Sequence, residues 1–261
     1  MESLLSRFSA VIKKASTSEI AADPTLAGSL LLDEAGPLTI AYAPFDYINA
    51  KARVVLVGIT PGRQQAVNAI VEARRGLVAG HDLAAVAKAA KETASFSGSM
   101  RSSLIEMLDH IGLSKWLEIK SCRELFGART DLIHYTSALR YPVYLNGSNY
   151  SGNPSMVSTP LLRRQIMAYL SEEARVLPNA VWVPLGPAPA SALAMLASDG
   201  VLNADRILDG LPHPSGANGE RIAYFLGRKD RQALSAKTSP ENLDAARERL
   251  MSRMLELKPG V

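Results

Sequence analysis

The sequence contains a single cysteine, Cys122. It therefore excludes an internal disulfide, a zinc site built from four cysteines, and an iron–sulfur cluster held by the chain's own thiolates. No apolar run reaches the ~20 residues that a transmembrane helix requires, and the N-terminus lacks the apolar core and cleavage site of a signal peptide. We therefore expect a cytoplasmic protein with no membrane partner, no metal and no cofactor.

The sequence also lacks internal repeats, low-complexity linkers and a strong charge bias. Its 261 residues are 47% hydrophobic and 21% charged, which is typical of a folded globular protein. Lysine and arginine number 29 against 25 acidic residues, and the pI is about 9.2. This balance permits a polyanionic partner without requiring one.

Short apolar segments alternate with helical patterns along the chain. Four of them are predicted as strands: Val54–Gly58, Leu132–Ala138, Ala180–Leu185 and Ile207–Leu208. Alternation of this kind favours an α/β fold, here a single three-layer α/β/α domain around a central, mainly parallel four-stranded sheet. We expect one domain over residues 1–261 with a core at 54–226, a helical and loop extension at 1–50, and a C-terminal helix at 239–257.

Helix signals support this plan. Apolar residues from Leu4 to Ile12 share one helical face, and residues 64–75 are predicted as a helix that begins at a turn. Thr159-Pro160 and Ser239-Pro240 each place a capping residue before a proline, which is typical of a helix start. Residues 140–158 are rich in Tyr, Asn, Gly and Ser and are predicted to form a long surface loop. Residues 42–46 either cover the core or line a site.

Two turns stand out as candidate binding elements. The first ends the strand in Val54–Gly62, and the carboxyl end of a parallel strand is where ligands bind in open α/β sheets. The helix that follows would present free amides and its positive dipole end to an anion. Taken alone, this turn is more typical of a structural strand–turn–helix junction. The second turn, Pro212–Asn218, shifts the balance towards a functional site.

Five elements in order resemble those of the uracil-DNA glycosylase superfamily, across residues 54–226. They are Val54–Gly62 as the first motif, Phe96-Ser97-Gly98 with the helix at 104–112, Tyr135-Thr136-Ser137, Leu185-Gly186, and His213-Pro214-Ser215 with Gly216-Ala217-Asn218 as the second motif. The first motif is similar to the Gly-Ile-Asn-Pro-Gly of the mismatch-specific branch. The Phe96 loop looks like that of the iron–sulfur branches, although the cluster cysteines are absent.

The resemblance implies roles for individual residues. His213 would donate a hydrogen bond to the departing base, and Thr60 stands where the family positions the attacking water. Phe96 would stack on a base flipped out of DNA, and Ser137, Gly62 and Ile59 would line its pocket. A turn histidine without a catalytic role, and a Phe96 that packs into the core, are the structural alternatives.

The same resemblance and the charge around the motifs imply a DNA-binding surface. Its predicted residues are Gly58, Pro61, Arg63, Pro214, Ser215, Gly216, Asn218, Arg221, Arg228 and Lys229. Glycine and proline turns let the backbone approach phosphates, and a serine hydroxyl adds a contact. For the basic side chains, an ordinary solvated face is the alternative. We expect the partner to be DNA and the protein to be a monomer.

Three departures from the family affect specificity and chemistry. Thr60 replaces an Asp or Asn and is a poor base, and Ser137 replaces the Asn that reads the pyrimidine edge. Gly62 stands where the most uracil-specific branch has a Tyr that blocks the pyrimidine C5 position. Asp46, Asp209 and Glu220 lie near the motifs as conceivable substitute bases, but the pattern favours solvated surface carboxylates for all three.

Three functions remain open. The first is a monofunctional DNA glycosylase for a pyrimidine with a bulky C5 substituent, such as the hydroxymethylated or glucosylated bases of phage DNA, which suggests phage defence. The second is a repair glycosylase for uracil or deaminated bases. The third is a catalytically silent DNA-binding module. The presence of both His213 and Phe96 favours an enzyme.

Overall fold

The structure is a computed structural model that describes residues 3–95 and 100–257. Phe96, the predicted stacking residue, lies outside the described residues. The chain divides into two compact units, each assembled from separate segments. The first comprises Met1–Ile48, Ile59–Ser95 and Tyr135–Glu173, and the second comprises Asn49–Gly58, Phe96–His134 and Ala174–Val261. The expected single domain stays a prediction.

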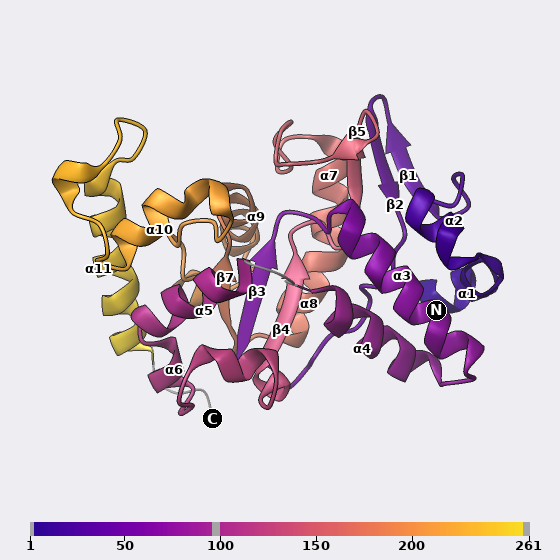
Figure 1. The fold of residues 1–261 in the computed structure, drawn as a ribbon, viewed down its shortest axis with the longest axis horizontal. Coiled ribbons are helices and arrows are strands. Elements are labelled where there is room, and N and C mark those ends of the chain that lie inside the picture. Colours follow the sequence, from indigo (N-terminus) through magenta and orange to yellow (C-terminus); the bar gives the residue numbers. More distant parts are fainter. Residues whose placement is uncertain (1–2, 96–99, 258–261) are drawn as a thin grey trace. The chain divides into compact units, whose positions relative to one another are not determined.

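The first unit contains α-helices and an antiparallel sheet, together with the start of a further helix, α8 (Figure 1). Its elements are α1 Leu4–Lys14, α2 Thr17–Ala22, β1 Leu31–Ala35, β2 Leu38–Ala41, α3 Arg63–Val78, α4 Leu83–Ala94, β5 Val143–Leu145, β6 Ser148–Asn149 and α7 Pro160–Gln165. A π-helical turn at Ile166–Leu170 joins α7 to α8, Ser171–Val176, whose last residues belong to the second unit.

The antiparallel sheet has the order β1-β2-β5-β6 and corrects two expectations. The predicted loop at 140–158 contains the β5–β6 hairpin, in which Tyr144 pairs with Asn149. Its two-residue turn, Asn146-Gly147, has positive φ at both positions, the type I′ geometry that matches the twist of a hairpin. Part of the extension expected as helix and loop at residues 1–50 forms the β1–β2 hairpin instead. Gly36-Pro37 forms the turn between its two strands.

Helix α3 packs against α1, α2 and α4. The predicted N-terminal amphipathic helix is confirmed as α1, which buries Leu5, Phe8 and Ile12. The helix predicted for residues 64–75 is also confirmed, since α3 starts directly after Gly62. Pro160 opens α7 as predicted.

A network of charged side chains is buried in the first unit. Arg140, which is 5% exposed, donates through Nε to Glu173 at 2.8 Å and through Nη2 to the Tyr169 carbonyl at 2.9 Å. Lys91 donates to the Tyr47 carbonyl at 2.7 Å and lies 3.8 Å from the Glu173 carboxylate. Burial lowers the pKa of Lys91 to about 8. Buried charges of this kind are tolerated only when they are paired and hydrogen-bonded, so the network is part of the folded framework.

The second unit is built on a parallel sheet of order β4-β3-β7. The strands are β3 Val54–Gly58, β4 Ile133–Ser137 and β7 Val181–Pro184, and residues 135–137 of β4 belong to the first unit. The fold class is therefore mixed α/β, as expected. The expected fourth strand is wrong: Ile207 forms one isolated bridge to Trp182. Gly210, with φ of +122°, ends the extended segment too soon for a ladder.

The helices of the second unit are α5 Met100–His110, α6 Leu113–Trp116, α9 Pro187–Ser198, α10 Gly219–Phe225 and α11 Pro240–Glu256. Helix α10 packs against α5 and α11, and α9 packs against β7. The Ser239 side chain accepts from the Asn242 amide, which confirms the predicted start of α11. Among the described residues, no helix is both long and apolar enough to span a bilayer.

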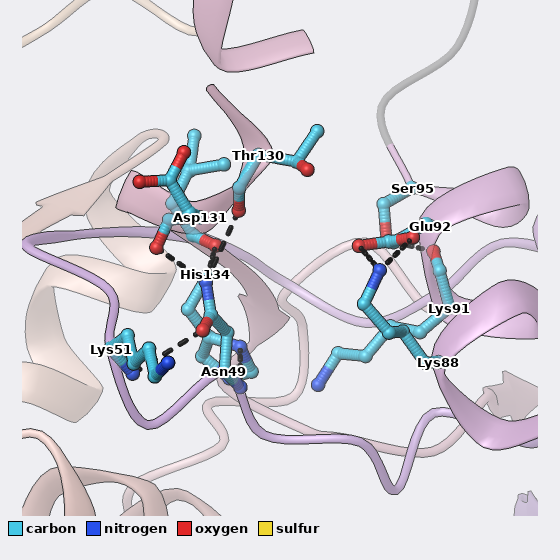
Figure 2. A network of polar contacts seen from close by, with 10 residues as sticks. Asn49, Lys51, Lys88, Lys91, Glu92, Ser95, Thr130, Asp131 and His134 are labelled. Atoms are coloured by element: carbon cyan, nitrogen blue, oxygen red, sulfur yellow. Dashed lines mark hydrogen bonds and ion pairs between the residues drawn. The ribbon is translucent and has the colours of Figure 1, made fainter. Parts of the chain in front are cut away.

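A buried asparagine fixes the segment that enters β3. Figure 2 shows Asn49 beneath the Thr130 and Asp131 carbonyls and beside His134. Its Nδ2 donates to the carbonyls of Thr130, Asp131 and Ile133 at 2.8–3.1 Å, and its amide N–H donates to Nδ1 of His134 at 3.3 Å. The same figure shows the exposed Lys88–Glu92 pair one turn apart on α4. Asn49 satisfies buried backbone groups, and the Lys88–Glu92 pair does not. Asn49 therefore contributes more to the stability of the fold than this surface ion pair.

Candidate functional site

The first-motif turn, residues 60–63, is held by hydrogen bonds within the first unit. The Thr60 hydroxyl donates to the Tyr141 carbonyl at 2.9 Å and accepts from the Val143 amide at 3.1 Å. A hydroxyl has one proton to donate, so Thr60 has none left for a ligand. Its remaining lone pair can still accept from a water molecule. The predicted role of Thr60 in water positioning stays a prediction, and its present bonds tie the turn to β5.

The start of α3 is also occupied by side chains. The Gly62 amide donates to Oε1 of Gln65 at 3.0 Å, and the Arg63 amide donates to Oδ1 of Asn149 at 2.9 Å. The first helical amides were expected to be free for an anion, but two of them are already satisfied in this way. A Cβ built on Gly62 would lie 3.6 Å from Nδ2 of Asn149, so this amide faces the open side of the glycine.

The other predicted residues of the first unit have distinct surroundings. The Arg63 guanidinium donates to the Ala22 carbonyl at the end of α2, a favourable position for a cation at a helix C-terminus. The Ile59 carbonyl accepts from the Leu139 amide at 3.0 Å. Ser137, half-buried at the end of β4, has no hydrogen bond from its side chain within the described residues. Ser137 thus keeps its hydroxyl available, whereas Arg63 is used within the fold.

The second-motif turn, residues 213–218, belongs to the second unit, and its central feature is His213. The Ser215 amide donates to Nδ1 of His213 at 3.3 Å. Because Nδ1 accepts, the proton of the neutral ring resides on Nε2. Partial burial lowers the pKa of His213 below its usual value. The ring is therefore neutral at pH 7 and presents Nε2–H as a donor.

Gly186, which follows β7, has its side-chain-free side towards His213. It has φ of +104°, a conformation that side-chain-bearing residues rarely adopt, and a Cβ built there would lie 3.9 Å from Cβ and Cδ2 of His213. Sequence reasoning identified Leu185-Gly186 as part of the resemblance but assigned no role to the glycine. In the structure, a side chain at this position would come into van der Waals contact with His213.

A hydrogen-bonded chain connects three predicted DNA-binding residues. Nη1 of Arg221 donates to Oδ1 of Asn218 at 2.9 Å, and Nδ2 of Asn218 lies 3.1 Å from Oγ of Ser215. Since Asn218 donates to this oxygen, the Ser215 hydroxyl keeps its own proton for another acceptor. A second nitrogen of Arg221 donates to the Lys237 carbonyl, so its charge faces no carboxylate through these bonds. Gly216 is exposed, and a Cβ there would meet open space.

Two predicted phosphate-binding side chains are instead paired with acids. Arg228 contacts Glu106 at 2.7 Å, and Lys229 contacts Glu220 at 2.8 Å. The hydrogen bond from Lys229, together with those from Ser235 and Thr238, holds the pKa of Glu220 well below the usual range. The positive charges of Arg228 and Lys229 are thus compensated within the second unit, which makes both weaker candidates for phosphate binding than Arg221.

The three carboxylates considered as substitute bases now differ. Both oxygens of Asp46 accept phenolic hydroxyls, from Tyr42 at 2.6 Å and from Tyr141 at 2.7 Å. Glu220 is saturated by the bonds described above. Asp209 is exposed, and no side-chain hydrogen bond from it occurs within the described part of the chain. It lines a cavity of about 440 Å³ together with Gly186, Pro187, Ala190, Ser191, Ala194, Gly210 and Leu211. Bound hydroxyls stabilise the charged form of a carboxylate, so Glu220 is a poor base, and the two phenols already occupy both oxygens of Asp46.

Sequence reasoning missed Asn149. The signal was present, because Asn146-Gly147 between Leu145 and Ser148 is a strong marker of a two-residue hairpin turn. Recognising the hairpin would have given the register of β5 and β6, but not the contact of Asn149 with α3.

The expected meeting of Gly62, Ser137 and His213 at one sheet edge stays a prediction. Within residues 3–95 and 100–257, no group of three or more His, Cys, Asp or Glu is arranged to hold a metal.

The chain was compared with known proteins. It is 37% identical over 202 residues to a Bacillus subtilis (strain 168) protein named "Uncharacterized protein YoxB". That match covers 76% of this chain and 79% of the Bacillus protein. No protein-family model and no solved structure matches the chain. At this identity and coverage, the chain belongs to the same family as Bacillus subtilis YoxB.

Proposed function

We propose that this protein is a monofunctional DNA glycosylase that flips a modified base out of DNA and hydrolyses its N-glycosidic bond. The favoured substrate is a pyrimidine with a bulky polar group at C5, such as hydroxymethylated or glucosylated cytosine in phage DNA. The observation that supports this proposal most directly is the state of His213: a neutral ring whose Nδ1 accepts from Ser215 and whose Nε2–H is a donor.

This histidine suits the chemistry of base release. As the N-glycosidic bond breaks, negative charge develops on the departing base. A fixed N–H donor stabilises charge that exists only near the transition state, and interactions of that kind raise the rate rather than ground-state affinity. The bond from Ser215 orients the ring before the reaction. Little reorganisation is then needed when the charge appears.

The second-motif turn also suits a nucleic-acid backbone. The Ser215 hydroxyl retains its proton for a phosphate oxygen, and the Arg221 charge lies on the same chain of hydrogen bonds. Phosphate contacts from hydroxyls and arginines position a protein on DNA without reading sequence. The base must leave the stack before its glycosidic bond is accessible, so binding to the backbone would precede flipping.

The substrate assignment is based on Gly62 and Ser137. Gly62 has no side chain to block a C5 substituent, and Ser137 cannot form the paired hydrogen bonds by which an asparagine reads uracil. A site built on paired hydrogen bonds rejects analogues strongly, whereas one without them discriminates by shape and is more tolerant. A bulky C5 group is therefore compatible with these residues.

The test is a base-release assay under single-turnover conditions. Duplex and single-stranded oligonucleotides would carry one uracil, hypoxanthine, hydroxymethylcytosine or glucosylated hydroxymethylcytosine. We expect release of the C5-modified base and strand cleavage only after alkali treatment, as for a monofunctional enzyme. His213→Ala is the control. Efficient release of uracil with the bulky bases untouched would instead support a repair glycosylase.

A catalytically silent DNA-binding protein is the second candidate. It is favoured by the hydrogen bonds that already occupy the Thr60 hydroxyl and the Asp46 and Glu220 carboxylates. Among the carboxylates considered as bases, this leaves the exposed Asp209 as the one without a side-chain hydrogen bond within the described residues. The same assay separates the two candidates. Binding to every oligonucleotide without release of any base would support the silent module.

A further inference from the structure

The β5–β6 hairpin brings one polar side chain to the start of α3. Oδ1 of Asn149 accepts from the Arg63 amide at 2.9 Å, which fixes the orientation of the side-chain amide. Its Nδ2 then lies 3.6 Å from the position of a Cβ on Gly62. The type I′ turn and the pairing of Tyr144 with Asn149 hold this register. Asn149 is therefore fixed across the bare side of Gly62.

The donors of this amide are available. Asn149 is exposed, and within the described residues its Nδ2 donates to no other group. An amide nitrogen has two N–H donors and no acceptor capacity. The surface beside Gly62 is therefore not simply empty: a group placed there would meet two donors.

A second polar group lies on the same face of the hairpin. Tyr144 and Asn149 are directly opposite in the antiparallel register, so their side chains share a face. Tyr144 is 4% exposed, and its buried hydroxyl has no hydrogen-bond partner among the described residues. Burial raises its pKa to about 12, so the hydroxyl stays protonated. Unpaired buried hydroxyls are costly, and they are found where a ligand or water completes the bonding.

We propose that Asn149 is a specificity-determining residue that donates hydrogen bonds to the oxygens of the C5 substituent. This inference rests on the proposed function and narrows its substrate class. The preferred base is a pyrimidine whose C5 group has hydroxyl or ether oxygens, as in hydroxymethylated and glucosylated cytosine. A methyl group at C5 has no acceptor and gains nothing from the amide.

The decisive variant is Asn149→Asp. Aspartate keeps an oxygen to accept from the Arg63 amide, and its charge is favourable at a helix N-terminus, so the cap on α3 is preserved. It has no N–H to donate. Ser148→Asp is the matched control, because it adds the same charge at the neighbouring exposed position of β6, on the opposite face.

The measurement is kcat/KM for oligonucleotides with glucosylated hydroxymethylcytosine, relative to the smallest base that the wild type releases. We expect Asn149→Asp to lower this ratio at least ten-fold and Ser148→Asp to change it less than two-fold. Thermal unfolding verifies that both variants are folded. An unchanged ratio in Asn149→Asp, or an equal fall in both variants, would overturn the role of Asn149.

A binding measurement separates this inference from the proposed function. Fluorescence anisotropy would compare oligonucleotides with and without the glucosylated base, in the His213→Ala background. We expect the background to bind the modified strand more tightly, and the added Asn149→Asp change to abolish that preference. If the wild type releases no base, the enzyme proposal fails while this preference still tests Asn149. No preference in the His213→Ala background would reject Asn149 whatever the activity.

Discussion

The first-motif and second-motif turns contain similar residue types but use their polar groups differently. In the first turn, the Thr60 hydroxyl and the amides of Gly62 and Arg63 are bonded to other parts of the first unit. In the second, His213 keeps Nε2–H and Ser215 keeps its hydroxyl proton, while internal bonds orient both groups. The first turn uses its polar groups for folding, whereas the second keeps two oriented donors that these bonds do not use.

This difference shows why a matching motif is an incomplete argument for function. Every buried donor and acceptor needs a partner, and a turn that satisfies these needs internally has little left for chemistry. The hydrogen-bond partners of each group must therefore be identified before it is given a catalytic role. From the difference between the two turns, we expect His213 to act in base release and Thr60 to stabilise the fold. Mutations can test both expectations.

The largest expected effect follows from His213→Ala. Removing a comparable transition-state donor costs on the order of 10²–10³ in rate. We expect a loss of this size in single-turnover base release, with DNA affinity changed less than three-fold. Rapid-quench kinetics with saturating enzyme measure the first quantity, and anisotropy measures the second.

If His213→Ala releases the base at an unchanged single-turnover rate, the second turn has no catalytic role that distinguishes it from the first. His213→Gln provides a control, because its side-chain amide can still donate a hydrogen bond. Partial recovery of the rate in this variant, relative to alanine, would identify the hydrogen bond as the missing element.

The pH dependence of kcat/KM gives a second test of the role of His213. Burial lowers the pKa of His213 below 6.5, so the neutral ring dominates at pH 7 and above. Protonation would convert Nδ1 from an acceptor to a donor facing the Ser215 amide, and the ring would lose its orientation. We expect kcat/KM to be constant from pH 7 to 8 and to fall about ten-fold per unit below the lowered pKa. An acid limb with a midpoint above 6.5 would contradict this assignment, and His213→Gln should lack the limb.

A smaller effect is expected from the basic residues of the second unit. Arg221→Met removes a charge that pairs with no carboxylate among the described residues, whereas Arg228→Met removes one already paired with Glu106. We expect the Arg221 variant to bind DNA several-fold more weakly and to lower the slope of log K against log salt by about one. The Arg228 variant should change both quantities less. If both variants lower the affinity and the salt slope equally, the Arg228–Glu106 ion pair opens when the protein binds DNA.

The sequence was sufficient to predict the elements that depend on local patterns. The buried run Val54–Gly58 and the proline starts of α7 and α11 appear where they were expected. These signals depend on neighbouring residues and on helical or strand periodicity. The fourth strand failed because Ile207 makes one bridge before Gly210 redirects the chain, and no local pattern shows where a ladder stops.

The sequence predicted which residue types form the candidate site, but not which hydrogen bonds their side chains make. That Thr60 would bond to Tyr141 and Val143, or Asn149 to Arg63, depends on segments about 80 residues apart in the sequence. The pairing of Arg228 with Glu106 is likewise long-range. Local sequence identifies which groups are present, whereas tertiary packing decides which of them remain free.

The smallest catalytic effect, and a clear stability effect, are expected from Thr60→Val. Valine has nearly the same shape but no hydroxyl, so the Tyr141 carbonyl loses a donor and the buried Val143 amide loses an acceptor. Leaving buried groups unpaired costs about 1–3 kcal/mol. We expect the free energy of unfolding, measured by urea titration, to fall by about that amount, while base release slows less than ten-fold. Thr60→Ser retains the hydroxyl and should recover most of the stability. If Thr60→Val instead abolishes base release at unchanged stability, the hydroxyl holds the attacking water and the first turn is catalytic as well.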